Sequence, residues 1–171
     1  MTTIRAETAA DRAAIHEVNA LAFGREAEAG LVDAIRDSPE FIPELSLVAE
    51  WDGRVAGHVL FSRIVIRTAD SDVPALTLAP VAVRPEAQNQ GVGTALVREG
   101  LERARALGHR IVVVIGHPTY YPRFGFAPAR PQGLEAPFPI ADPPFMALAL
   151  VPGALDGVRG TVVYPPAFEG V

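Results

Sequence analysis

A turn with two spaced glycines is the part of this chain best suited to bind an anion. An apolar segment, Val81-Ala82-Val83, precedes a polar stretch over residues 84–90, and Gly91 and Gly93 then open an amphipathic segment. Glycine has no Cβ, so a ligand can approach the amides of the first helical turn, which lack intrahelical acceptors. The helix dipole favours negative charge at the same place. We therefore expect a strand, an anion-binding turn and a helix, in that order.

The residues around these glycines argue against two common nucleotide-binding motifs. A Walker P-loop places four residues between its glycines and continues with Lys and then Ser or Thr, whereas Gly93 is followed by Thr94-Ala95. A dinucleotide-binding fingerprint needs a third glycine where Leu96 stands and an acidic residue on the next strand, which Arg110 to Ile115 lacks. The spacing therefore excludes ATP or GTP binding by a P-loop and disfavours NAD.

The pattern Gln-x-x-Gly-x-Gly, formed by Gln88, Gly91 and Gly93, resembles the pyrophosphate-binding motif of the GNAT superfamily of N-acetyltransferases. The anion bound there is acetyl-CoA. After the next apolar strand, Ile111 to Ile115, residues 121–126 (Tyr-Pro-Arg-Phe-Gly-Phe) match that family's Tyr-x-x-x-Gly-Phe element. The motifs cover the central half of the chain, the element order covers nearly all of it, and the likeness is greatest to small bacterial N-acetyltransferases of unassigned substrate.

The resemblance implies a mixed α/β (α+β) fold with a mostly antiparallel sheet flanked by helices, in which strands four and five splay apart. Pro80 in strand four has no amide hydrogen, so that strand is either at an edge of the sheet or interrupted there. In the family, the pantetheine arm enters the splay and pairs with main-chain groups, here those of Val81 and Val83. The resemblance implies acetyl-CoA as cosubstrate and coenzyme contacts from Val81, Ala82, Val83, Gln88, Asn89, Gln90, Gly91, Val92, Gly93 and Thr94. We expect no metal, because the four histidines show no metal-ligand spacing and the chain has no cysteine. Many members of the family have arginine where this chain has the uncharged Gln88, which could cap the turn or reach a phosphate oxygen.

Tyr121 is the candidate general acid. It lies in the region of a short helix expected over residues 118–123, where the family places a tyrosine hydroxyl facing the coenzyme sulfur. Direct acetyl transfer needs a stabilised or protonated thiolate, and a hydrogen-bonded phenol can provide this. Tyr120 is the alternate residue for this role. The structural alternative is that Tyr121 is an amphipathic side chain that only packs at the rim of the cleft.

The general base is less well defined by the sequence. Many family members use a glutamate on strand four or a chain of waters, but strand four offers no carboxylate here. His117 follows strand five and carries an imidazole, a group that commonly accepts protons near neutral pH, although it could instead cap the following turn. Glu50 and His58 could also face the acceptor, but each is better explained as a solvated or core-edge residue.

The remaining patterns predict the elements that would position these residues. An Asp52-Gly53 turn indicates a hairpin with strands over 45–51 and 54–66. A capping-box-like start at Thr8 predicts a helix that Gly24 stops, followed by a second helix over 26–35 and an exposed linker with Phe41 and Ile42. Further elements are expected as a first strand over 3–7, strand four over 75–83, a helix over 91–107 before Gly108, a rigid proline-rich loop over 127–144, and strands over 145–151 and 160–164.

Length and composition fit one ordered domain over residues 1–171, with a core of about 2–151 and a C-terminal extension over 152–171. Hydrophobic residues make up 49% and charged residues 20% of the 171 residues, which is typical of globular proteins. The net charge of −5 and the lack of a basic block argue against a nucleic-acid partner, and the absence of cysteine excludes a covalent cysteine intermediate. No apolar run is long enough to cross a membrane, so we expect a cytoplasmic protein.

The sequence thus predicts an enzyme that transfers the acetyl group of acetyl-CoA directly to a primary amine, either a small molecule or a peptide N-terminus. The first two helices, Phe41-Ile42 and the proline-rich loop would surround the acceptor. An acyl-CoA-binding regulatory or scaffolding module without turnover is the alternative, since Gln88 is uncharged and strand four lacks a base. An α/β protein without any CoA function is a third interpretation, and the sequence leaves open whether the protein is a homodimer.

Overall fold

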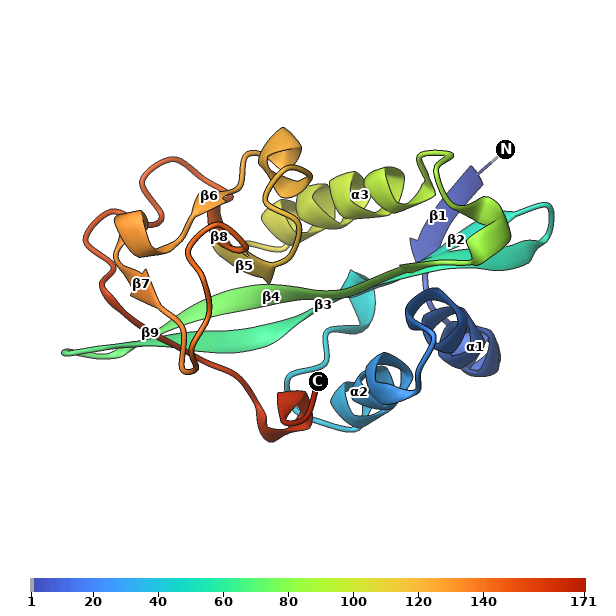
Figure 1. The fold of residues 1–171 in the computed structure, drawn as a ribbon, viewed down its shortest axis with the longest axis horizontal. Coiled ribbons are helices and arrows are strands. Elements are labelled where there is room, and N and C mark those ends of the chain that lie inside the picture. The colour runs from blue at the N-terminus through green and yellow to red at the C-terminus, as the bar shows by residue number, and fades with distance from the viewer. Residues whose placement is uncertain (1) are drawn as a thin grey trace. The chain divides into compact units, whose positions relative to one another are not determined.

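Residues 2–171, which the computed structural model describes, form a nine-stranded mixed sheet flanked by helices (Figure 1). The α-helices are α1 (Arg12–Phe23), α2 (Ala27–Arg36) and α3 (Val92–Ala106). The strands are β1 (Thr2–Ala6), β2 (Ser46–Trp51), β3 (Arg54–Thr68), β4 (Asp72–Val83), β5 (Ile111–Ile115), β6 (Ala127–Pro128), β7 (Leu134–Glu135), β8 (Phe145–Ala149) and β9 (Gly160–Val163). Short 3₁₀ turns are η1 (Ala9–Asp11), η2 (Pro43–Leu45), η3 (Pro85–Ala87), η4 (Tyr121–Phe124), η5 (Arg130–Gln132) and η6 (Pro166–Phe168).

The strand order is β1-β2-β3-β4-β5-β8-β6, and β9 pairs with both β3 and β7. Most neighbouring strands are antiparallel, while β4 and β5 are parallel, as the predicted fold class requires. Because β4 lies between β3 and β5, the edge-strand interpretation of Pro80 is wrong. The parallel pairs join Leu76 to Val112 and Thr77 to Val113, both before Pro80 in the chain, which is the arrangement that an interruption at Pro80 predicts.

By their contacts, the residues divide into two compact units. Unit 1 contains the chain up to Ser62, then Ala79–Arg103 and Pro166–Val171; unit 2 contains Arg63–Leu78 and Ala104–Pro165. The long strands β3 and β4 and the helix α3 each contribute residues to both units. No helix of residues 2–171 combines the length and the apolar character needed to span a membrane.

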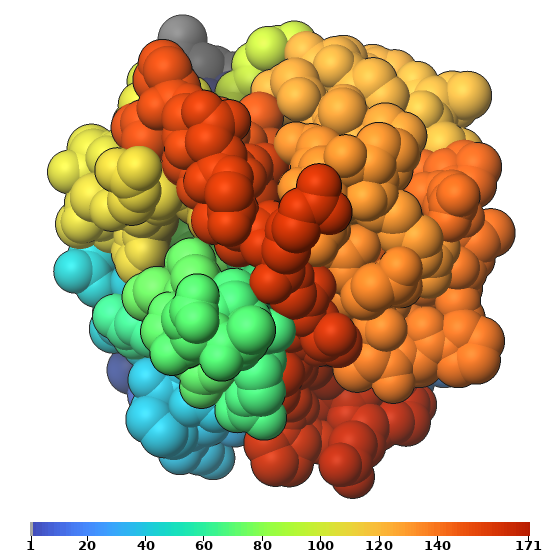
Figure 2. Space-filling view, turned by 90° about the vertical axis from the view of Figure 1, so that its left-hand side faces the viewer, coloured from blue at the N-terminus to red at the C-terminus, as the bar shows by residue number. Residues whose placement is uncertain are grey.

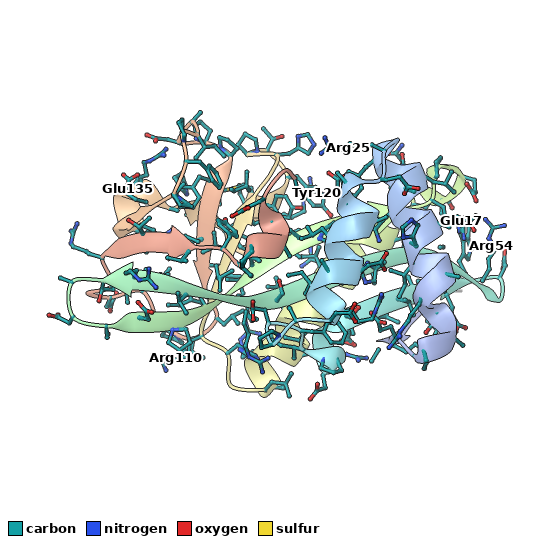
Figure 3. The ribbon with its side chains drawn as sticks, turned by 90° about the horizontal axis from the view of Figure 1, so that it is seen from below. Glu17, Arg25, Arg54, Arg110, Tyr120 and Glu135 are labelled. Carbon is teal, nitrogen blue, oxygen red and sulfur yellow. The ribbon has the colours of Figure 1, made fainter. Side chains whose placement is uncertain are left out.

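In unit 1, α1 and α2 cover one face of the strands and α3 lies on the other (Figures 1 and 3). The core beneath α1 and α2 joins Ile15 and Ile35 to Leu60 and Ala82. As predicted, a capping box between Thr8 and Asp11 opens this helical region, and Gly24 ends α1 in a left-handed conformation.

The linker after α2 differs from its prediction. Ile42 is 3% exposed, and Phe41 packs against the same core as α1 and α2, so the expectation of an exposed linker was wrong. These apolar side chains close the core beside α2, and their apolar surface is thereby removed from water. The Asp52-Gly53 hairpin is confirmed, since both residues have positive φ (53° and 77°).

In unit 2, β5, β8 and β9 surround a core that includes Val113, Phe145 and Val162. The proline-rich segment over 127–144 contains the two short strands β6 and β7, which the sequence analysis missed because a two-residue bridge leaves little pattern in a sequence. Figure 2 shows this segment beside residues 150–165, and the pairing of Leu134 with Gly160 joins the two.

Candidate functional site

The turn predicted to bind an anion lies in unit 1 between β4 and α3, and we call residues 88–94 the cradle. Asn89 and Gly91 both have positive φ (62° and 82°), so the chain turns sharply before the helix begins. The first helical hydrogen bond runs from the amide of Ala95 to the carbonyl of Gly91 at 3.0 Å. The amides of Val92 and Gly93 therefore belong to the first turn, where an α-helix supplies no intrahelical acceptors.

Gly93 leaves space that the protein itself does not need. Its φ lies outside the left-handed region, and a Cβ placed on it would be 3.6 Å from Cγ2 of Val83 and 3.8 Å from Cγ1 of Val81. These are ordinary van der Waals distances, so neither backbone conformation nor packing requires glycine here. The half-buried side chains of Val81 and Val83 thus face the start of α3, while Ala82 is buried in the core beneath α1 and α2.

Gln88 contributes to the turn. Its side-chain Nε2 donates a hydrogen bond to the carbonyl of Val83 at 3.0 Å, so the amide closes the loop from the end of β4 to the cradle. This contact corresponds to the first of the two roles considered for Gln88.

Tyr121 lies in unit 2 in a cluster of aromatic rings after β5. Its ring makes edge contacts with Tyr120 (centroids 5.1 Å apart) and Phe126 (5.8 Å). Burial raises the pKa of Tyr121 to about 12, so the hydroxyl stays protonated at neutral pH. The short helix expected over 118–123 starts later than predicted, as the 3₁₀ turn η4 that begins at Tyr121, because residues 117–120 form a turn first.

Gly116, the residue after β5, makes room for this tyrosine. A Cβ on Gly116 would overlap Cε2 of the Tyr121 ring and lie 3.1 Å from Cδ2. The amide of Gly116 donates to the carbonyl of Pro144 at 3.0 Å, which fixes the backbone beneath the ring. Gly116 had no predicted role, because only the fold brings it against Tyr121.

His117 is exposed, and its main chain stabilises the turn before Tyr121. The carbonyl of His117 accepts hydrogen bonds from the amides of Tyr120 (3.1 Å) and Tyr121 (3.3 Å). The capping role considered for the histidine side chain is thus filled by its backbone.

The other two candidate bases have different surroundings. Glu50 is partly exposed and accepts hydrogen bonds from Arg5, with Nε at 2.7 Å from Oε1. His58 is fully buried between Asn19 (3.2 Å) and Ser46 (2.9 Å). Burial, assisted by the charge of Arg36, lowers the pKa of His58 to about 3, so this imidazole is a poor proton acceptor at neutral pH.

Comparison with known proteins decides the family. Residues 3–129 match the family described as acetyltransferase (GNAT) domain. The chain belongs to the GNAT family of acetyltransferases. The predicted family and the predicted class of enzyme, an N-acetyltransferase, are confirmed.

Relatives of similar length support the assignment. The uncharacterized N-acetyltransferase YjhQ of Escherichia coli K12 is 44% identical over 77% of this chain and 74% of its own length. The crystal structure of the GNAT family N-acetyltransferase YhbS from E. coli in complex with CoA is 34% identical, covers 98% of this chain and 91% of its own, and has a TM-score of 0.90. A GNAT family acetyltransferase from Brucella melitensis in complex with acetyl-CoA is 35% identical, covers 99% of both chains and has a TM-score of 0.81.

Within this GNAT fold, the structure groups the predicted residues into two sets. Val81, Val83 and Gly93 come together at the start of α3, and Tyr121 lies with Tyr120 and His117 after β5. The roles of these residues in binding and catalysis remain predictions.

Proposed function

We propose that this protein binds acetyl-CoA in the cradle and transfers its acetyl group directly to a primary amine. The observation that carries the proposal is the unfilled space at Gly93, beside first-turn amides at the start of a 15-residue helix. Such a site suits a pyrophosphate, because the amides donate to its oxygens and the helix dipole favours its charge. Relatives about one third identical to this chain are described in complex with CoA or acetyl-CoA.

The proposed coenzyme site uses main-chain groups more than side chains. The amides of residues 88–94 would hold the pyrophosphate, and the main chain of Val81 to Val83 would pair with the pantetheine arm. Gln88 brings no positive charge, so affinity would depend on the backbone geometry of the turn. This dependence makes the residues that shape the turn as important as those that line it.

In the proposed reaction, the amine nitrogen forms a bond to the acetyl carbon, the carbon–sulfur bond breaks, and the amine loses a proton. Tyr121 would assist the departure of the thiolate. A phenol with a pKa of about 12 is a weaker acid than a thiol near 8.5, so the hydroxyl would act mainly as a hydrogen-bond donor to the developing thiolate. Tyr120 is the alternate donor.

For the base, we propose either His117 or ordered water that relays the proton to solvent. His117 is exposed to solvent, whereas His58 is buried and neutral and Glu50 is held by Arg5. The acceptor would be a small amine or a peptide N-terminus. We further propose that residues 1–171 act as one acetyltransferase domain, since β3 and β4 contribute to both compact units.

The decisive experiment measures thioester consumption. Purified protein is incubated with acetyl-CoA and a panel of amines that includes small amines and short peptides with free N-termini, and free thiol is followed over time. Release of CoA that depends on an amine, with formation of the N-acetyl product by mass spectrometry, would support the proposal. Binding of acetyl-CoA by calorimetry without turnover of any amine would favour the regulatory module instead, and absence of binding would contradict both.

A further inference from the structure

Arg84 joins three elements of unit 1 just before η3, the turn that leads into the cradle. It is the first residue after β4, and its side chain is 8% exposed. Its Nε donates to the carbonyl of Val55 on β3 at 2.7 Å, and Nη1 donates to Oε1 of Glu17 on α1 at 2.8 Å. A buried guanidinium is therefore satisfied by one strand and one helix.

The main chain of Arg84 is held as firmly as its side chain. Its amide donates to the carbonyl of Ala56 at 2.8 Å, and its carbonyl accepts from the amide of Ala87 at 2.9 Å. The direction in which the chain leaves β4 and enters η3 is thus fixed on both sides of Arg84. Gln88, the first residue of the cradle, follows η3 directly.

We propose that Arg84 is a positioning residue for coenzyme binding, because it fixes the turn that presents the amides of the cradle. The inference rests on the proposed coenzyme site. Arginine suits this task because its planar guanidinium donates in two directions at once, whereas a lysine ammonium is a single compact charge on a flexible stem. Loss of Arg84 would let the cradle adopt several conformations, so part of the binding energy would be spent on ordering it.

Two competing roles for Arg84 predict different results. In the first, Arg84 stabilises the fold without any influence on the cradle; in the second, its positive charge attracts the anionic coenzyme from a distance. Arg36 on α2 is a matched control for the first role, since its side chain is 7% exposed and paired with Glu7 at 2.9 Å in the same unit. Glu17 tests the second role: its removal deletes a negative charge, which raises affinity for an anion if only charge matters.

The test is calorimetric titration of the full chain with acetyl-CoA, at a temperature where each variant is folded. We expect Arg84→Met to bind about tenfold more weakly, the effect of losing hydrogen bonds to a charged group. Glu17→Ala should bind about two- to fivefold more weakly, as expected from an ion pair with an exposed partner (Glu17 is 60% exposed). Arg36→Met should bind acetyl-CoA like the wild type, even if its melting temperature falls as far as that of Arg84→Met.

Hydrogen exchange supplies a readout that does not depend on coenzyme. The amides of residues 88–93 should exchange faster in Arg84→Met than in Arg36→Met at equal global stability. Wild-type affinity and exchange in Arg84→Met, an equal loss in Arg36→Met, or tighter binding in Glu17→Ala would overturn the inference.

Two further outcomes are separable. If Arg84→Met does not fold, Glu17→Ala decides, because it keeps the bond from Arg84 to Val55, and unchanged affinity and exchange in this variant would overturn the inference. If the wild type itself does not bind acetyl-CoA, the proposed function is wrong, and Arg84 then has no role in coenzyme binding.

Discussion

Gly93 at the start of α3 and Gly116 just after β5 are both glycines in regions predicted to carry function, yet their surroundings differ. A Cβ on Gly93 would make ordinary contacts with Val81 and Val83, so the fold itself does not require glycine there, and the proposed coenzyme site would explain it. A Cβ on Gly116 would overlap the ring of Tyr121, so that space is already filled by the protein. A glycine in a motif can therefore serve a ligand or serve the fold, and only the neighbouring atoms distinguish the two.

The largest effect is expected from Gly93→Val. The branched side chain would occupy the space at the first-turn amides. The loss of two hydrogen bonds to a charged pyrophosphate, each worth about 1.5–3 kcal/mol, predicts an affinity weaker by at least about 100-fold. Gly93→Ala should lose less affinity and should stabilise α3 by up to about 1 kcal/mol. Calorimetric titration and thermal unfolding check both variants; full affinity in a folded Gly93→Val protein would remove the cradle as the coenzyme site.

Tyr121→Phe should affect turnover and leave binding intact. Loss of the hydroxyl should lower kcat by about ten- to a thousandfold with little change in coenzyme affinity, because the hydroxyl would act on the departing thiolate. Tyr120→Phe should have a smaller effect. Steady-state kinetics of both variants check this, and a larger loss for Tyr120→Phe would move the role to the neighbouring residue.

Gly116→Ala should destabilise the protein, because the new side chain would clash with the ring of Tyr121. The new methyl group would displace the Tyr121 ring, which should cost about 1–3 kcal/mol of unfolding free energy. We expect kcat to fall as well, though by less than in Tyr121→Phe. In a Tyr121→Ala background, Gly116→Ala should cost little more in kcat, and a double-mutant cycle measures this. Equal losses in both backgrounds would mean that Gly116 acts independently of the tyrosine.

The pH dependence separates the two candidate routes for the amine proton. If His117 is the base, kcat/KM should rise with pH along an acidic limb, because a protonated imidazole cannot accept a proton, and His117→Gln should lose this limb. Two amines of different basicity distinguish an enzyme group from the substrate, whose own limb shifts with its basicity. Because burial raises the pKa of Tyr121 to about 12, this residue should add no alkaline limb below about pH 11. An acidic limb that survives in His117→Gln would assign the role of proton acceptor to water or to Glu50.

Gln88→Ala should have a small effect on coenzyme affinity. It removes one neutral, exposed hydrogen bond to the carbonyl of Val83, worth about 0.5–1.5 kcal/mol, so affinity should fall by about two- to tenfold. Gln88→Arg is the informative companion, because a positive charge beside a bound pyrophosphate should raise affinity at low salt. Unchanged affinity in both variants would place the pyrophosphate away from this residue.

Much of the architecture follows from local patterns in the sequence. Asp52-Gly53 specified its hairpin because few residues adopt positive φ at both turn positions, and Gly24 and Gly108 ended their helices for the same conformational reason. Errors arose where burial depends on distant partners. Ile42 is buried and Pro80 lies in a central strand, because helix packing and strand order are set by contacts between residues far apart in the sequence.

The sequence by itself determined the family, the order of the main elements and the position of the glycine turn, since each depends on residue types at fixed short spacings. Tertiary structure alone decided which side chains are buried, which have space beside them and which lie next to a charged partner. It made His58 a buried neutral residue, brought Gly116 beneath Tyr121, and joined Glu17 to Arg84, which lies 67 residues further along the chain. The space around a side chain and its electrostatic environment depend on its neighbours in three dimensions, and the spacing of residues along the chain does not specify those neighbours.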